Sequence, residues 1–236
     1  MTIIDIPDSK AKIWASAYQR IGFVLRFIRS SPWLAHRLFH VNVVSTKHQH
    51  IWDGTTWVLR KALRRYVEDG YRVLELGTGH IGVLAIYCSR IRKIQMVAVD
   101  INQSFIENAK LVANASVALQ IEFRQSDWFS NVNGKFDIVF SNVPYIPTDI
   151  GVGIDTLTKY REVWDGGPDG GNEIRRILKD IPNFLTPRGR LLLGIAPLYL
   201  PRSAVLGLIE NRPELELENI VTSTLSPCEV YVIRAK

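Results

Sequence analysis

The hydrophobic and polar positions of residues 54–236 follow two alternating patterns. Short apolar runs, such as residues 71–76 and 136–141, alternate with segments whose apolar residues recur every three or four positions. The runs are typical of strands covered on both faces, and the longer spacing is typical of amphipathic helices. We expect strands at residues 71–76, 94–99, 119–124, 136–141, 190–195, 215–221 and 229–234, and helices at residues 55–68, 81–92, 102–115, 172–185 and 202–211.

This order of elements predicts the fold class. Strands that alternate with helices form a parallel sheet with helices on both faces. The last two strands have no helix between them, which predicts a hairpin with one antiparallel member. We therefore expect an α/β fold with a Rossmann-like, doubly wound, mostly parallel seven-stranded sheet and a C-terminal hairpin. Residues 142–171 are expected to form a long loop.

The first 50 residues differ from the rest of the chain. Apolar residues recur at helical spacing from Ile13 to Ile28, Ser31 and Pro32 interrupt the pattern, and a second short helix is expected to follow. We expect two parts: a small helical N-terminal segment, residues 1–50, and one domain, residues 51–236. The segment is interpreted as an appendage that packs on the domain, with target recognition or a membrane surface as the alternatives.

Charge is also unevenly distributed along the chain. The net charge is +6, from 29 Lys and Arg against 23 Asp and Glu. Residues 1–50 hold seven basic and two acidic side chains, so the remaining residues are almost neutral. A basic excess favours acidic partners or nucleic acid. The N-terminal segment is therefore a candidate docking site for an acidic partner.

Composition excludes several classes of protein. An apolar content of 47% excludes a disordered chain. Cys88 and Cys228 cannot build a disulfide framework, and no apolar run is long enough for a membrane span. With no signal peptide expected either, a cytoplasmic location is the prediction. His36 and His40 have helical i, i+4 spacing without an evident third ligand, so no metal site is expected.

A glycine-rich turn follows the first strand of the domain. Gly77, Gly79 and Gly82 lie between that strand and the next helix, where glycine lets the backbone approach a ligand and exposes N–H groups. Asp100 ends the next strand, where a carboxylate can accept hydrogen bonds from ribose hydroxyls. These features fit a dinucleotide or another adenosine cofactor, so a nicotinamide oxidoreductase remains an alternative.

The third strand ends in a polar segment with an aromatic residue. Asp127 is placed to accept a hydrogen bond from an adenine amino group, and Trp128 to pack on the adenine ring. Helix capping by Ser126 and Asp127 and core packing of Trp128 are the structural alternatives.

The acidic Glu75 before the turn, the Gly-Thr-Gly turn and Asp100 together resemble the class I S-adenosylmethionine-dependent methyltransferases. The resemblance spans about residues 50–236 and implies S-adenosylmethionine as cofactor, S-adenosylhomocysteine as product and no metal. One departure is His80-Ile81-Gly82, where many relatives have a small residue and then glycine; we expect His80 to be a capping or surface residue. The implied cofactor-binding residues are Glu75, Gly77, Thr78, Gly79, Asp100, Ile101, Ser126, Asp127, Trp128 and Asn142.

The fourth strand leads directly into Asn142-Val143-Pro144-Tyr145. This segment resembles the Asn-Pro-Pro-Tyr motif of methyltransferases that modify planar nitrogen atoms. The Asn142 side-chain oxygen and the Val143 carbonyl can each accept a hydrogen bond from a target –NH₂. Pro144 stiffens the turn, and Tyr145 offers a face for stacking. Val143 replaces the first proline of the motif but keeps the backbone acceptor.

A second segment points to one branch of that family. Residues 163–171, Val-Trp-Asp-Gly-Gly-Pro-Asp-Gly-Gly, resemble the Gly-Gly-x-Asp-Gly stretch of the HemK/PrmC branch, which methylates a glutamine in peptide-chain release factors. Residues 51–56 occupy the place of the pre-domain motif of that branch but match it poorly; from their position alone, Thr55 or Thr56 is expected near the cofactor. The N-terminal segment is also shorter than the docking domain of the release-factor enzymes.

The predicted function is an N-methyltransferase that acts on a planar amide or amino nitrogen, first of all on a protein glutamine. A nucleic-acid base and a small-molecule amide or amine are the alternative substrates. The alternative classes are a catalytically silent cofactor-binding subunit, the oxidoreductase named above, and a methyltransferase acting on oxygen or carbon. A monomer and a homodimer are both compatible with the sequence.

Overall fold

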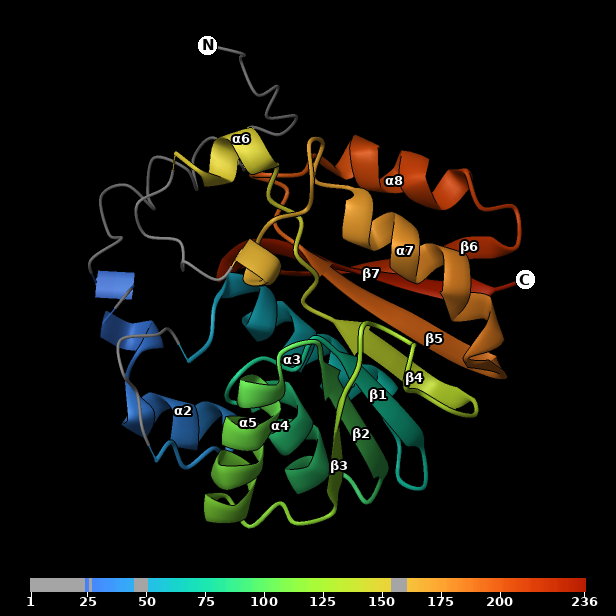
Figure 1. The fold of residues 1–236 in the computed structure, drawn as a ribbon. Coiled ribbons are helices and arrows are strands. Elements are labelled where there is room, and N and C mark those ends of the chain that lie inside the picture. Colours follow the sequence, from blue (N-terminus) through green and yellow to red (C-terminus); the bar gives the residue numbers. More distant parts are fainter. Residues whose placement is uncertain (1–23, 26, 45–50, 154–160) are drawn as a thin grey trace.

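A computed structural model describes residues 24–25, 27–44, 51–153 and 161–236 (Figure 1). Most of the predicted helix from Ile13 to Ile28 lies outside these residues. The second short helix is α2 (Pro32–Phe39), which Ser31 caps by accepting a hydrogen bond from the Leu34 N–H at 3.4 Å. Phe39 is fully buried in the core of the main domain.

Seven strands form one sheet in the order β3-β2-β1-β4-β5-β7-β6. Neighbouring strands from β3 to β5 are parallel, whereas β7 is antiparallel to both β5 and β6. The predicted sheet and its closing hairpin are therefore confirmed. The strands are β1 (Arg72–Leu76), β2 (Gln95–Asp100), β3 (Ile121–Gln125), β4 (Phe136–Ser141), β5 (Leu185–Ile195), β6 (Leu215–Ser223) and β7 (Ser226–Ala235).

Helices cover both faces of the sheet (Figure 1). On one side lie α3, α4 and α5, and on the other α7 and α8. Within the described residues, no helix is long and apolar enough to cross a membrane. The helices of the domain are α3 (Gly54–Tyr66), α4 (Val83–Ile91), α5 (Gln103–Ala115), α6 (Thr148–Gly151), α7 (Asn172–Asp180) and α8 (Arg202–Glu210), with short 3₁₀ turns η1 (Arg161–Val163) and η2 (Ile181–Asn183).

Several element boundaries differ from the prediction; β5, for example, begins at Leu185 and not at residue 190. Two of the differences have a clear local reason. Helix α4 begins after Gly82, whose φ of 66° is left-handed and not helical. Helix α7 ends at Asp180 because Pro182 cannot continue an α-helix, and the chain passes into η2. The expected long loop contains the short elements α6 and η1.

The strand order brings two loops together at the carboxyl edge of the sheet. The chain leaves β1 toward β2 on one side and leaves β4 toward β5 on the other, although β1 and β4 are neighbours. Leu76 pairs with Ser141, and the Ser141 hydroxyl donates to the Leu76 carbonyl at 2.9 Å. Gly77 and Asn142 therefore begin their loops next to each other, at the place where open α/β sheets bind ligands.

Candidate active site

The turn after β1 is held from below by a buried carboxylate. Gly77 and Gly79 have φ of 71° and 67°, a left-handed backbone that favours glycine. Glu75 accepts hydrogen bonds from the Thr78 hydroxyl at 2.6 Å and from the Ala85 N–H at 3.1 Å. Burial raises the pKa of Glu75 to about 8. Glu75 thus ties the turn to the start of α4, and its contact with the cofactor stays a prediction.

Asp100 closes the side of the turn. One carboxylate oxygen accepts the Gly79 N–H at 2.8 Å, and the other accepts the Asn102 N–H at 3.0 Å. The side chain is 7% exposed, and burial raises its pKa above the ordinary value for aspartate. Each oxygen keeps a second lone pair. Asp100 can therefore accept ribose hydroxyls while it holds the turn.

The residues after β3 link the turn to α7. Trp128 has a φ of 47°, and its indole N–H donates to Glu173 at 2.6 Å. A Cβ atom on Gly77 would lie 3.8 Å from the Trp128 ring, so the ring borders the turn. The exposed Asp127 carboxylate forms an ion pair with Arg176 at 2.7 Å.

Ser126 and Ile101 complete the predicted cofactor residues. The Ser126 hydroxyl donates to the Trp128 carbonyl at 2.8 Å and accepts the Asn131 N–H at 2.9 Å, which fixes the loop that carries Asp127. Ile101 follows Asp100 and is 51% exposed, which leaves an apolar surface next to the carboxylate.

The loop after β4 presents Asn142 and buries the three residues that follow it. The Asn142 amide donates to Asp53 at 3.4 Å, and its oxygen makes no hydrogen bond within the described residues. The Tyr145 hydroxyl forms a hydrogen bond with that of Thr55 at 3.2 Å, and the Tyr145 ring is 8% exposed. In this structure Tyr145 supports the loop from inside, and its stacking role stays a prediction.

The glycine-rich loop packs directly on this motif. The Gly166 N–H donates to the Ile146 carbonyl at 2.9 Å, and the Ile146 N–H donates to the Trp164 carbonyl at 3.0 Å. A Cβ atom on Gly166 would come within 2.8 Å of the Tyr145 backbone, and one on Gly170 within 2.5 Å of the Tyr145 carbonyl oxygen. Glycine is needed here because two backbones approach closely.

Comparison with known proteins agrees with this geometry. Residues 67–196, more than half of the chain, match the family described as "Methyltransferase domain". The chain belongs to this family. The predicted class, an S-adenosylmethionine-dependent methyltransferase with a Rossmann-like fold, is thereby confirmed for the domain.

Two curated relatives of this methyltransferase domain have names that specify a substrate. The chain is 38% identical over 117 residues to "Putative protein N5-glutamine methyltransferase MJ0928" of Methanocaldococcus jannaschii, over 50% of this chain and 57% of the relative. It is 30% identical over 169 residues to "Release factor glutamine methyltransferase" of Agrobacterium fabrum, over 66% of this chain and 58% of the relative. The chain thus spans somewhat more than half the length of these relatives.

A solved structure gives the same fold. The methyltransferase from Pyrococcus furiosus aligns with a TM-score of 0.65 at 18% identity, over 90% of this chain and 97% of that one. At this identity the likeness concerns the fold alone.

Sequence reasoning missed one residue of this methyltransferase site. Asp53 caps α3, accepting the Thr56 N–H and hydroxyl at 2.7 Å each, and its other oxygen faces Asn142. The signal was present as an Asp-x-x-Thr capping box before an apolar stretch. The sequence instead predicts a cofactor contact by Thr55 or Thr56. In the structure the Thr55 hydroxyl forms a hydrogen bond with Tyr145, and the Thr56 hydroxyl donates to Asp53.

His80 lies outside the polar part of the methyltransferase site. Its ring packs near Phe105, with the centroids 5.8 Å apart, and burial lowers its pKa. No group of three or more potential metal ligands occurs within the described residues.

Proposed function

We propose that this protein transfers a methyl group from S-adenosylmethionine to the side-chain amide nitrogen of a glutamine in a substrate protein. The carrying observation is the position of Asn142 beside the glycine turn, with its amide N–H turned toward Asp53. This orientation leaves the Asn142 oxygen available to accept from a planar –NH₂ group. The Val143 carbonyl, fixed in the buried part of the loop, is the second proposed acceptor.

The residues around the glycine turn fit the cofactor. Left-handed glycines leave room beside the backbone, Asp100 offers acceptors for ribose hydroxyls, and Trp128 and Ile101 offer apolar surface. Asp127 would accept from the adenine amino group while it remains paired with Arg176. When bound, S-adenosylmethionine supplies an electrophilic methyl group on its sulfonium centre.

The protein contributes orientation more than acid–base chemistry. Two acceptors on one –NH₂ group fix its plane and aim the nitrogen lone pair across the gap between the β4 and β1 loops. Holding two reacting groups in this way removes several kcal/mol of the barrier. The buried Pro144 and Tyr145 keep the acceptors in place.

Substrate choice is supported by names and motifs rather than by contacts. Both relatives above are named as glutamine methyltransferases. The predicted glycine-rich segment of that branch packs on the Asn142 loop, as a shared site requires. A cytoplasmic location and a monomeric or homodimeric state belong to the same proposal.

The test is methyl transfer by an Asn142→Ala variant. Loss of the oriented acceptor is expected to lower kcat by about 100-fold, with cofactor affinity within a few-fold of the wild type. Radiolabelled methyl transfer into fractionated lysate measures turnover, and amino-acid analysis of the labelled protein identifies N5-methylglutamine. Asn211→Ala, an exposed position at the end of α8, is the matched control.

Two results would contradict the proposal. Full turnover by Asn142→Ala would remove Asn142 from the reaction. Label that enters RNA or small molecules instead of protein would replace glutamine as the substrate.

A further inference from the structure

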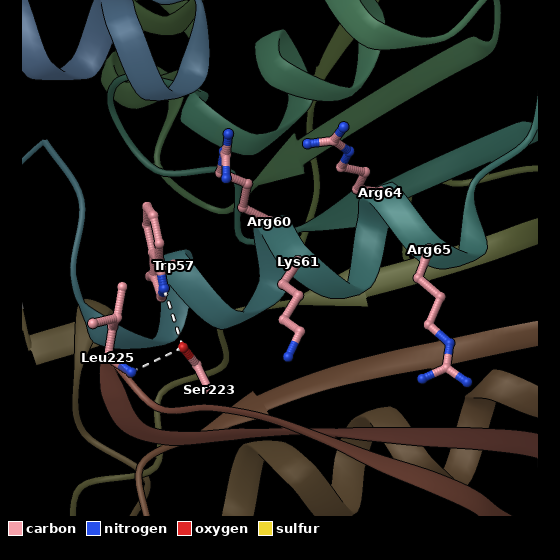
Figure 2. A pocket seen from close by; sticks show the side chains of 7 residues that line it. All are labelled: Trp57, Arg60, Lys61, Arg64, Arg65, Ser223 and Leu225. Carbon is pink, nitrogen blue, oxygen red and sulfur yellow. Dashed lines mark hydrogen bonds between the residues drawn. The ribbon is translucent and has the colours of Figure 1, made fainter.

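The solvent face of α3 carries a stripe of basic side chains. Arg60, Lys61, Arg64 and Arg65, together with Trp57, are spaced three and four apart on the outward side of the helix. In Figure 2 Arg60 and Arg64 point to one edge of this side, and Lys61 and Arg65 point to the other edge, toward the β6–β7 hairpin. The opposite side of α3 is buried against β5 and β7. The stripe therefore faces outward with its backbone rigidly supported.

A groove runs beside this stripe. The tip of the β6–β7 hairpin forms its second wall, where the Trp57 indole N–H donates to the Ser223 hydroxyl at 3.3 Å (Figure 2). Lys61 donates to the Thr222 carbonyl at 2.8 Å, and the neighbouring Leu225 is 70% exposed. The groove has a volume of about 450 Å³.

A second cavity joins the stripe to α4. Arg60 and Arg64 line it together with His40, Tyr87 and Arg92, and its volume is about 250 Å³. The Arg60 guanidinium lies 5.1 Å from the centre of the Tyr87 ring, which holds it in place. Three arginines on one small cavity are a donor set suited to phosphate.

Among the described residues, no carboxylate forms an ion pair with the basic side chains of this region. Arg60 donates to the Leu38 carbonyl at 2.7 Å, Arg92 to the Val67 carbonyl at 3.0 Å and Arg90 to the Val117 carbonyl at 3.4 Å. Within the described part of the chain, none of these arginines forms an ion pair, and neither do Lys61, Arg64 and Arg65.

The lowered pKa of His40 is consistent with the same positive environment. Its pKa is lowered first by burial and then by the charges of Arg90 and Arg60. A bound anion would offset these charges.

We propose that the groove along α3 binds the phosphate backbone of a single RNA strand. Arg60 and Arg64, like Lys61 and Arg65, are four residues apart, a rise of about 6 Å along the helix, so the stripe offers cations at regular intervals. Because α3 is packed against the sheet and walled by the hairpin, it cannot enter the major groove of a duplex. An extended polyanion can lie in this open groove along the basic side chains of α3.

The groove leads away from the candidate active site. Helix α3 begins at Gly54, next to Thr55, whose hydroxyl forms a hydrogen bond with that of Tyr145 in the loop after β4. RNA bound along α3 would thus place one end of the strand near that loop. This inference goes beyond the proposed function and does not depend on which group is methylated.

The experiment measures binding of fluorescein-labelled dodecauridylate to the full chain by anisotropy, between 50 and 200 mM salt and without any methyl donor. We expect the wild type to bind with affinity that falls steeply with salt. The Lys61→Gln/Arg64→Gln variant, changed at exposed positions, is expected to bind at least tenfold more weakly. Its log–log salt slope should be smaller by about 1.4, since each single-strand phosphate contact contributes about 0.7.

The control is Lys179→Gln/Arg188→Gln, which removes the same charge at exposed positions outside the groove. Equal weakening by the control, or wild-type binding by the groove variant, would overturn the proposal. So would tighter binding of a twelve-residue polyglutamate peptide or of duplex DNA than of the RNA. Since no methyl transfer is measured, these results stand apart from those of the Asn142 experiment.

Discussion

At the scale of single residues, Asp53 connects the start of a helix to Asn142, the proposed acceptor for the target nitrogen. One oxygen caps α3 and the other accepts from Asn142, so the same carboxylate fixes both. The two residues are 89 positions apart, and no local pattern could predict their contact. The positions of the glycines, Asp100 and Asn142 were predictable because each stands at a strand end in a known pattern, while their roles stay predictions.

Asp53→Ser separates the two roles of Asp53. Serine also caps helices, so the free energy of unfolding should stay within about 0.5 kcal/mol of the wild type. Without the acceptor for its amide group, Asn142 loses its fixed orientation, and kcat should fall by about tenfold with little change in the cofactor Kd. Denaturant unfolding and labelled methyl transfer measure the two effects. An unchanged kcat would make Asp53 a capping residue only.

The buried Glu75 makes stability depend on pH. Its folded-state pKa of about 8 lies above the ordinary 4.5, so the folded protein holds the proton more tightly than the unfolded chain does. This contribution to stability is fully present below pH 4.5 and is lost as the pH rises through about 8. Glu75→Gln, which keeps an acceptor for Thr78 and Ala85, should flatten the decline. Urea unfolding of both proteins at pH 5 and pH 8 measures the free energy of unfolding. An equal loss of stability between the two pH values in both proteins would contradict this role of Glu75.

At the scale of elements, patterns predicted the existence of helices and strands better than their ends. The period of apolar residues identified all seven strands, whereas backbone conformation decided where α4 begins and α7 ends. The close packing of the glycine-rich loop on the Asn142 loop could not be predicted, because it joins two irregular segments. The sequence shows the glycines of this loop, but it does not show that they pack against the backbone of Tyr145.

Two glycine substitutions test this packing. Gly170 has a φ of 78° and faces the Tyr145 carbonyl, so Gly170→Ala should cost at least about 1 kcal/mol of stability and lower kcat. Gly207 lies within α8 with open space around it, so Gly207→Ala should stabilise the protein by about 0.5 to 1 kcal/mol at full activity. Thermal unfolding and methyl transfer compare them. If both substitutions destabilised the protein equally, the contact of Gly170 with the Tyr145 backbone would not explain the effect of Gly170→Ala.

At the scale of the whole molecule, net charge concealed how charge is arranged. Residues 51–236 are almost neutral in sum, yet the basic side chains of α3 and α4 gather on one face. From charge counts along the chain, the net positive charge was assigned to residues 1–50. Those counts do not show the basic face of α3, because it arises from helical spacing and from the neighbouring hairpin. Fold class, in contrast, followed from element order alone.

Cofactor identity is testable on the intact protein. S-adenosylhomocysteine at 100 times its Kd should stabilise the folded state by about 2.7 kcal/mol, which corresponds to a rise in Tm of roughly 5 to 10 °C for a chain of this size. NAD at the same concentration should leave Tm unchanged. A shift with NAD alone would contradict the binding of S-adenosylmethionine at this site. Asp100→Ala should remove the shift.

The neighbouring positions of β1 and β4 have a consequence for how the substrate specificity of such a protein evolves. Apart from Asn142, the proposed cofactor residues come from the half of the sheet that runs from β1 to β3, and the proposed target acceptors come from the half that starts at β4. Mutations can therefore accumulate in one half and redirect the enzyme to a new acceptor, while the ability to use the methyl donor is inherited intact. The replacement of a proline by Val143 lies in the half that is open to such drift.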